Sequence, residues 1–128
     1  MLGDTKAYSG FAVDDAARAR TFYSETLGIR TTVVDEQNGL MTLHLAGDRD
    51  TFVYQKPDFV PATYTILNFV VDDVAASVDA LSARGVKFER YEGFDQDEKG
   101  IAHGLGGGPD IAWFEDPAGN ILAVLQDM

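Results

Sequence analysis

Two histidines are the first candidates for metal binding or acid–base chemistry in this sequence. His44 and His103 are the only histidines, and there is no cysteine, so disulfides, thiolate metal sites and cysteine nucleophiles are excluded. In residues 42–45 (TLHL), strand alternation puts Thr42 and His44 on one sheet face. That face could line a binding site or meet solvent, and both interpretations stay open. His103 lies in a glycine-rich stretch and is expected in a mobile loop, with ligand contact as the alternative.

Paired aspartates and a glycine run also suggest chemistry, but each has a simpler explanation. The pairs at residues 14–15 and 72–73 precede helical patterns, which predicts helix N-capping rather than paired-carboxylate catalysis. Residues 104–108 (GLGGG) lack the Lys-Ser/Thr that follows in a phosphate-binding loop. We therefore expect a flexible connector there.

A repeat with an offset of 58 residues organises the chain, because residues 11–15 (FAVDD) return as residues 69–73 (FVVDD). Each copy has the pattern of a strand, a helix and three more strands. We predict one domain over residues 1–128, with a first module at about 4–57, a linker at about 57–63 and a second module at about 62–128. The strands are expected at residues 7–13, 30–35, 40–46, 51–56, 64–71, 86–91, 110–115 and 120–126.

Composition excludes several classes of function. The 128 residues carry 21 acidic and 10 basic side chains, for a net charge of −11, which disfavours nucleic acid as a partner. No apolar run approaches the roughly 18 residues that cross a membrane, and the first residues lack a signal-peptide profile. The expectation is a cytoplasmic protein with no membrane partner.

Three segments carry a resemblance to a known family. They are a first helix signature (VDD at 13–15, ARTFY at 19–23 and LG at 27–28), its second counterpart (VDDV at 71–74 and ARGV at 83–86) and a hairpin (WFEDPAGN at 113–120). Together they resemble the vicinal oxygen chelate superfamily, which comprises glyoxalases, bleomycin resistance proteins and dioxygenases. The resemblance implies an α+β fold of two tandem βαβββ modules, which form a curved eight-strand cup with the helices outside. It also implies frequent homodimers, and a divalent metal held in the cup by His, Gln or Glu.

The family's metal positions carry poor donors in this sequence. The resemblance aligns them with Tyr8, Ile66, Ala123 and a residue near Val53, with Tyr54 as the alternative if the alignment slips by one. Apolar side chains cannot bind a hard divalent cation. We therefore predict no metal and no cofactor.

Alternation predicts which side chains share a face with those positions, and most are apolar. The set could fill the interior or line a small-molecule site. We expect Tyr8 and Trp113 to contact a ligand, with His44, Gln55, Asn68 and Glu115 as polar groups. The predicted face comprises Tyr8, Gly10, Ala12, Thr51, Val53, Gln55, Ile66, Asn68, Val70, Ile111, Trp113, Glu115, Ile121, Ala123 and Leu125.

Two ligand-binding functions remain open, beside a dimeric module with no ligand of its own. The first is a metal-independent protein that binds a small, mainly apolar molecule, as bleomycin resistance proteins do. The alternative is a metal-dependent lyase, isomerase or dioxygenase acting on a small oxygenated compound.

Overall fold

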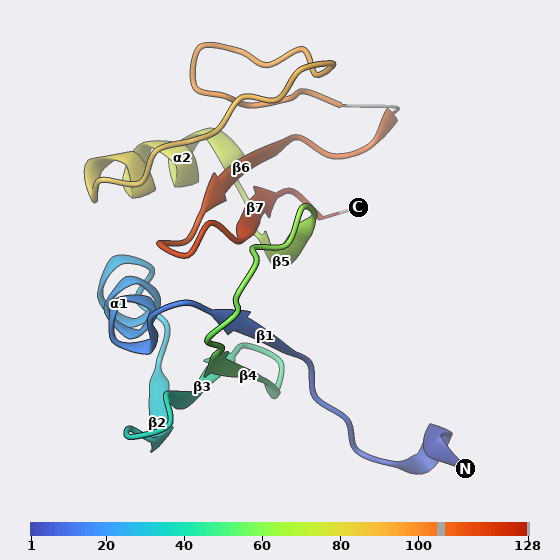
Figure 1. The fold of residues 1–128 in the computed structure, drawn as a ribbon. Helices are drawn as coiled ribbons and strands as arrows, with labels where there is room; N and C mark the ends of the chain where they lie inside the picture. The colour runs from blue at the N-terminus through green and yellow to red at the C-terminus, as the bar shows by residue number, and fades with distance from the viewer. Residues whose placement is uncertain (105–106, 128) are drawn as a thin grey trace. The chain divides into compact units, whose positions relative to one another are not determined.

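The computed structural model describes every residue except 105, 106 and 128. The chain divides into two compact units, Met1–Val60 (unit 1) and Pro61–Met128 (unit 2). Each unit is a β-sheet with its helix packed on one face (Figure 1). The α+β class expected from the sequence is thereby confirmed.

Unit 1 contains a four-stranded sheet in the order β1-β4-β3-β2. Strand β1 pairs in parallel with β4, whereas β4–β3 and β3–β2 are antiparallel. A short 3-10 helix, η1, precedes the sheet, and α1 continues directly into a π-helical turn, η2. The elements are η1 (Leu2–Asp4), β1 (Gly10–Val13), α1 (Ala16–Thr21), η2 (Phe22–Thr26), β2 (Thr31–Asp35), β3 (Leu40–Leu45) and β4 (Arg49–Gln55).

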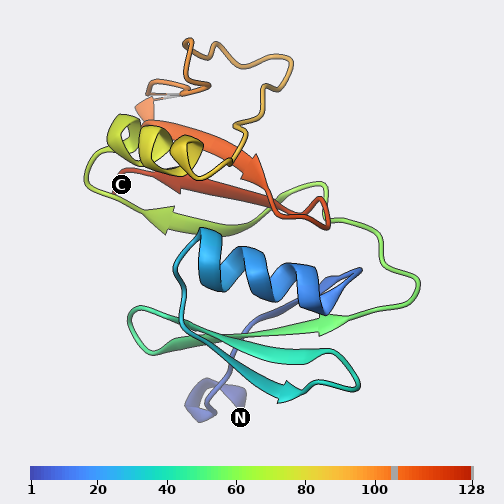
Figure 2. The ribbon, with the colours of Figure 1, turned by 90° about the vertical axis from the view of Figure 1, so that its left-hand side faces the viewer.

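Unit 2 contains a three-stranded sheet in the order β5-β7-β6, with β5 and β7 parallel. Helix α2 lies across one face of this sheet (Figure 2). The elements are β5 (Thr65–Val70), α2 (Val74–Ala83), β6 (Ile111–Glu115) and β7 (Ile121–Leu125).

The second aspartate of each acidic pair caps its helix, as the sequence predicts. The side chain of Asp15 accepts a hydrogen bond from the Arg18 amide, and that of Asp73 accepts one from the Ala76 amide. Each cap satisfies an amide that the first helical turn leaves without a partner. Helix capping therefore accounts for these aspartates.

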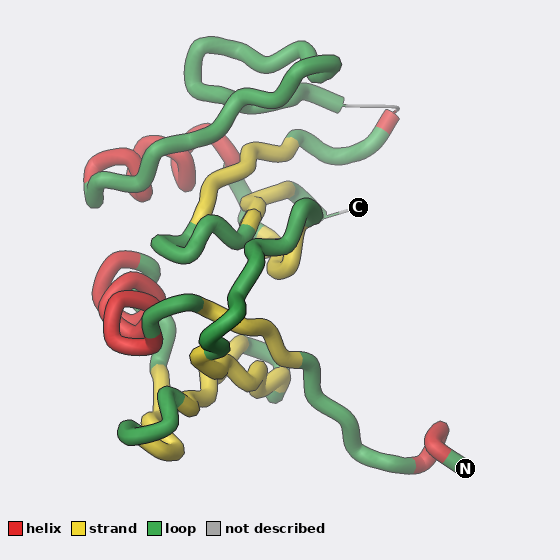
Figure 3. The backbone as a smooth tube through the Cα atoms, in the orientation of Figure 1, coloured by secondary structure: helices red, strands yellow, loops and turns green. Residues whose placement is uncertain are grey.

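The strand expected at residues 86–91 is not formed. Only an isolated bridge joins Phe88 to Phe114, with one further bond from the Glu89 amide to the Trp113 carbonyl. The side chain of Gln96 donates to the Glu89 carbonyl and accepts from the Tyr91 amide. These backbone groups therefore bond to a side chain instead of extending the ladder. The segment from α2 to β6 is mostly loop (Figure 3), and we call residues 87–104 the excursion.

The main cores lie between each sheet and its helix. In unit 1 the buried side chains include Val13, Tyr23, Met41, Leu43 and Val53. In unit 2 they include Val74, Val78, Phe114, Leu122 and Val124. The opposite face of each sheet, which we call its open face, is where the family resemblance predicts ligand contacts. Over the described residues, no helix is long and apolar enough to cross a membrane.

Candidate functional site

The open face of unit 1 carries a row of aromatic rings. Register places Gly10 opposite Phe52 and Ala12 opposite Tyr54, and the residues between them, such as Val53, point into the helix-side core. Tyr8 precedes β1 and meets Phe52 edge to face, with ring centroids 6.4 Å apart. Phe52 stacks on Tyr54 at 5.9 Å and 23°. We call Tyr8, Phe52 and Tyr54 the aromatic row.

The predicted face of β4 is wrong by one residue. Thr51 and Val53 are buried on the helix side of the sheet, and Gln55 shares that side. The Gln55 Oε1 atom accepts a hydrogen bond of 2.9 Å from the Ala16 amide at the start of α1. Parallel pairing of β1 with β4 sets this register, and the sequence pattern of either strand alone does not contain it. Gln55 is therefore a helix cap.

His44 lies on the open face of unit 1, where it shares a sheet face with Thr42 as alternation predicts. Its Nδ1 is 3.0 Å from Asp50 Oδ1, and its Nε2 is 2.6 Å from Thr32 Oγ1. Both partners come from neighbouring strands, so three strands together build this arrangement. Its side chain is 18 % exposed.

Trp113 lies on the open face of unit 2, opposite Ala123 on β7. Asn68 is paired with Ala123 from the other side and is exposed. Trp113 itself is buried and forms a small cluster with Ala102 and Ala123. The predicted grouping of Asn68, Trp113 and Glu115 on one face agrees with the strand register. The indole is covered, however, rather than open to solvent.

Two aromatic residues of the excursion cover the indole. Tyr91 meets Trp113 edge to face with centroids 5.6 Å apart, and Phe94 lies against it at 5.0 Å and 31°. Phe94 is 45 % exposed. The sequence pattern did not single out either residue, because both lie in a segment that was expected to be a strand followed by an irregular loop.

The hydroxyl of Tyr91 is buried and has no hydrogen-bond partner. Burial raises the pKa of this hydroxyl, and the charges of Glu115 and Glu89 raise it further. Desolvation likewise raises the pKa of Glu115, with smaller contributions from Glu89 and Asp116. Tyr91 is therefore a protonated donor near two carboxylates, an environment that disfavours an anion.

His103 is held by hydrogen bonds to two aspartates, although a mobile loop is expected from the sequence. Its Nε2 lies 2.7 Å from Asp97 Oδ2 and its Nδ1 lies 3.1 Å from Asp110 Oδ2. The first contact lies within the excursion, and the second joins the excursion to the segment that enters β6. Asp110 also accepts from the Gly104 amide. Of the expected flexible connector at 104–108, residues 105 and 106 lie outside the described part of the chain.

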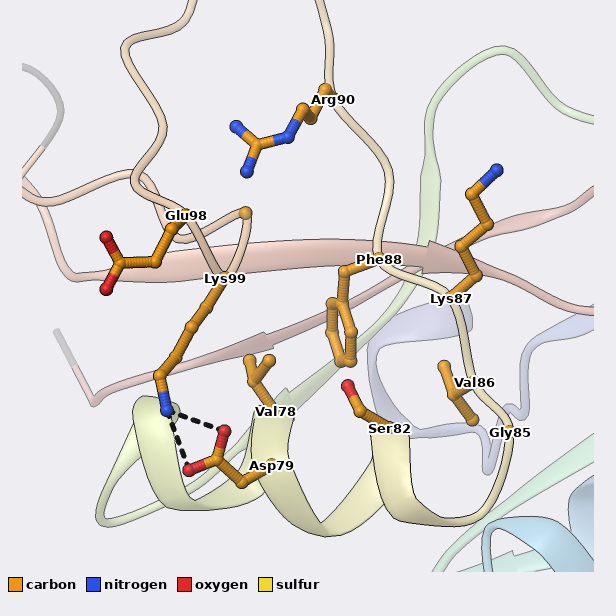
Figure 4. A pocket seen from close by; sticks show the side chains of 11 residues that line it. Val78, Asp79, Ser82, Gly85, Val86, Lys87, Phe88, Arg90, Glu98 and Lys99 are labelled. Atoms are coloured by element: carbon orange, nitrogen blue, oxygen red, sulfur yellow. Dashed lines mark hydrogen bonds and ion pairs between the residues drawn. The ribbon is translucent and has the colours of Figure 1, made fainter.

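A shallow groove of about 410 Å³ lies on the helix side of unit 2, between α2 and the excursion (Figure 4). Lys99 Nζ bonds to both carboxylate oxygens of Asp79 there, at 2.6 and 2.7 Å. Arg90 donates to the backbone carbonyl of Asp97 at 2.6 Å. Lys99 and Arg90 are therefore already engaged, and Lys87 is the third cation that lines the groove.

Comparison with known proteins then identifies the family. The model of the Glyoxalase/Bleomycin resistance protein/Dioxygenase superfamily matches residues 7–124. The chain belongs to this superfamily. No curated protein sequence matches the chain.

Solved structures with the same fold include proteins from several bacteria. An antibiotic binding protein from Streptomyces sp. CB03234 is 24% identical, with a TM-score of 0.69 and 98% of each chain covered. A glyoxalase/bleomycin resistance protein from the same organism is 25% identical, with a TM-score of 0.62, and covers 94% of this chain and 100% of its own. A superfamily member from Sphaerobacter thermophilus DSM 20745 is 20% identical, with a TM-score of 0.67. The match covers 95% of this chain and 98% of the Sphaerobacter chain.

The metal that the superfamily often binds does not fit the residues at the aligned positions. Ile66 and Ala123 have no donor atom. Tyr54, not Val53, shares the open face with Ala12. Like Tyr8, it offers only a phenol oxygen, and two tyrosines are a poor ligand set for a hard cation. Within the described residues, no group of three or more His, Asp or Glu side chains could hold a metal ion.

Proposed function

We propose that this superfamily member is a binding protein for a small, flat and mainly apolar molecule, and that it binds its ligand without a metal. The observation that carries the proposal is the aromatic row on the open face of unit 1. A row of touching rings on the sheet face opposite α1 offers stacking surface to a flat ligand. Tyr8 is 69% exposed, so this surface is accessible.

The polar groups beside the row suit orientation of a ligand rather than chelation. His44 and Thr42 lie on the same face as Phe52 and Tyr54. A mainly apolar surface with a few placed polar groups is typical of small-molecule sites. In unit 2, Asn68 and Glu115 are polar groups on the open face, beside a Trp113 indole that Tyr91 and Phe94 cover. We include the expected cytoplasmic location and homodimeric assembly in this proposal.

Calorimetric titration with uncharged flat aromatic compounds, 1-naphthol and coumarin first, tests the binding function. An aromatic anchor contributes about 2 kcal/mol, so Phe52→Ala or Tyr54→Ala should weaken binding by roughly thirtyfold. Tyr64→Ala is the matched control, because Tyr64 is also 69% exposed but precedes β5. Binding unchanged by the row variants, or no binding by any compound of the panel, would overturn the proposal.

Elemental analysis of protein purified without chelators tests metal independence. We expect far less than one equivalent of any divalent metal per chain, because the aligned positions lack donors. A content near one metal per chain would favour a metal-dependent lyase, isomerase or dioxygenase instead. His44 would then be the first ligand to replace.

A further inference from the structure

Three polar side chains form a hydrogen-bonded row on the open face of unit 1. Asp50 Oδ1 lies 3.0 Å from Nδ1 of His44, whose Nε2 lies 2.6 Å from Oγ1 of Thr32. An ionised carboxylate can only accept hydrogen bonds, so neutral His44 carries its proton on Nδ1. Nε2 is then the acceptor, and the Thr32 hydroxyl donates to it.

Hydrogen bonds that run in this direction, from the hydroxyl to the imidazole and from the imidazole to the carboxylate, are typical of an activated nucleophile. A hydroxyl within hydrogen-bond reach of a base, with the base oriented by a third group, is the arrangement that generates a reactive alkoxide during acyl transfer. Nothing in the packing of unit 1 requires the row, because Thr32 and Asp50 are exposed. A structural role in the core therefore does not account for it.

The position of Thr32 leaves its hydroxyl accessible. Strand β2 is at the edge of the sheet, and the open face bears no helix of unit 1. His44, in contrast, is 18% exposed, so the base is partly shielded while the hydroxyl meets solvent. This is the distribution of exposure that attack on an external substrate needs.

We propose that Thr32 is the nucleophile of an esterase activity, with His44 as the general base and Asp50 as its positioning residue. Thr32 Oγ1 attacks the carbonyl carbon of an ester, and its proton passes to Nε2 of His44. The bond to the alcohol breaks, and the alcohol leaves with that proton. Water then attacks the acyl group on Thr32, again through His44, which releases the carboxylic acid and restores the hydroxyl.

The surroundings indicate which ester the site accepts. Thr42 lies directly opposite Thr32 on β3 and opposite Phe52 on β4, so the reactive row adjoins the aromatic row. The substrate class is an uncharged ester of an aromatic alcohol, whose ring lies on Phe52 and Tyr54. The hydroxyl of Thr42 is on the same face and is the group we assign to the developing oxyanion.

Hydrolysis of 4-nitrophenyl acetate, followed by mass spectrometry of the acid-quenched protein, tests the proposal. We expect an acetyl group on Thr32 and turnover above the buffer rate. Removing a general base or its nucleophile typically costs about 100-fold or more, so Thr32→Val and His44→Asn should each lower kcat/KM by that factor. Thr32→Ser should retain both activity and the acetyl adduct.

The control variant is Thr31→Val, which changes the neighbouring threonine on the other face of β2 and should leave hydrolysis unchanged. Circular dichroism and binding of 4-nitroanisole, which has no ester, confirm that each variant is folded and still holds the ring. Absence of an acetyl group on Thr32, or equal kcat/KM in Thr32→Val and the wild type, would overturn the esterase. If the wild type does not bind 4-nitroanisole, that result would instead count against the proposed binding function.

Discussion

The rings of Phe94 and Trp113 lie with their centroids 5.0 Å apart and their planes inclined by 31°. Phe94 belongs to the excursion and Trp113 to β6, so a loop residue covers the indole on the open face of unit 2. The remaining cover comes from Tyr91 and Ala102. Trp113, which the sequence predicts as a ligand contact, is therefore part of a small packed cluster. Two predictions depend on this packing.

Replacing the indole should destabilise the fold. Trp113 is 9% exposed and packs against Ala102, Ala123 and Tyr91. Trp113→Ala should lower the free energy of unfolding by about 3–5 kcal/mol, measured by urea denaturation with circular dichroism. Unchanged stability would show that the indole lines an open cavity, as the binding interpretation of the sequence expects.

Removing the cover should expose the indole at a small cost. Phe94 is 45% exposed, and an aromatic pair of this kind contributes about 0.5–1.5 kcal/mol. Phe94→Ala should therefore increase acrylamide quenching of tryptophan fluorescence while lowering stability by about that amount. Trp113 is the only tryptophan, so the signal is unambiguous. Tyr64→Ala is the control, and quenching equal to wild type in both variants would contradict the predicted cover.

Gln55 should matter for stability and not for ligand binding. Its Oε1 accepts from the Ala16 amide, and loss of a capping bond costs about 1 kcal/mol. Gln55→Ala should show that loss in denaturant unfolding while binding 1-naphthol as the wild type does. Asp15→Ala, which removes the other cap of α1, is the matched comparison. Weaker 1-naphthol binding by a normally stable Gln55→Ala protein would restore the role first expected for this residue.

The excursion should respond to pH through His103. Hydrogen bonds that His103 donates to Asp97 and, with a smaller effect, to Asp110 raise the pKa of His103 above its ordinary 6.5. A raised folded-state pKa stabilises the fold fully below about 6.5, and the contribution disappears as pH rises through the raised value. Burial raises the pKa of Asp97, but hydrogen bonds from His103 and the Ile101 and Lys99 amides outweigh it and lower the pKa.

The measurement is the melting temperature of wild type and His103→Gln between about pH 5 and pH 9. The wild type should be the more stable at low pH, and the two curves should converge as pH rises. After division by the intrinsic exchange rate at each pH, the hydrogen-exchange protection of the Ile101 and Ala102 amides should fall over the same range in the wild type alone. Parallel melting curves would exclude His103 as the titrating group.

Assembly should be homodimeric. Strand β5 is at the edge of its sheet, and Val70 on it is 63% exposed. Exposed apolar edges are normally covered by another chain. Light scattering should give twice the sequence mass of 13.9 kDa at micromolar concentration, and Val70→Lys should shift the protein toward the monomer. A wild-type mass equal to that of the monomer would contradict this prediction.

Local sequence patterns determined most of the fold. The 58-residue repeat, the aspartate caps and the alternation within single strands depend on neighbouring residues only, and so can be read without a structure. The helix stop at Gly28 has the same origin, since its φ of 73° is one that glycine adopts readily. Phe11 and Phe114 lie on the helix side, where alternation along their strands places them.

The tertiary structure decided which faces meet. The assignment of Gln55 failed because the register between β1 and β4 is set by a parallel pairing across about 40 residues of chain, and alternation leaves either face of β4 possible. Phe52 and Tyr54 could have been found by aligning β4 with Gly10 and Ala12. The partners of His44, the cover over Trp113 and the bonds of Gln96 involve loops and other strands. Such contacts depend on the three-dimensional path of the chain, which no local pattern contains.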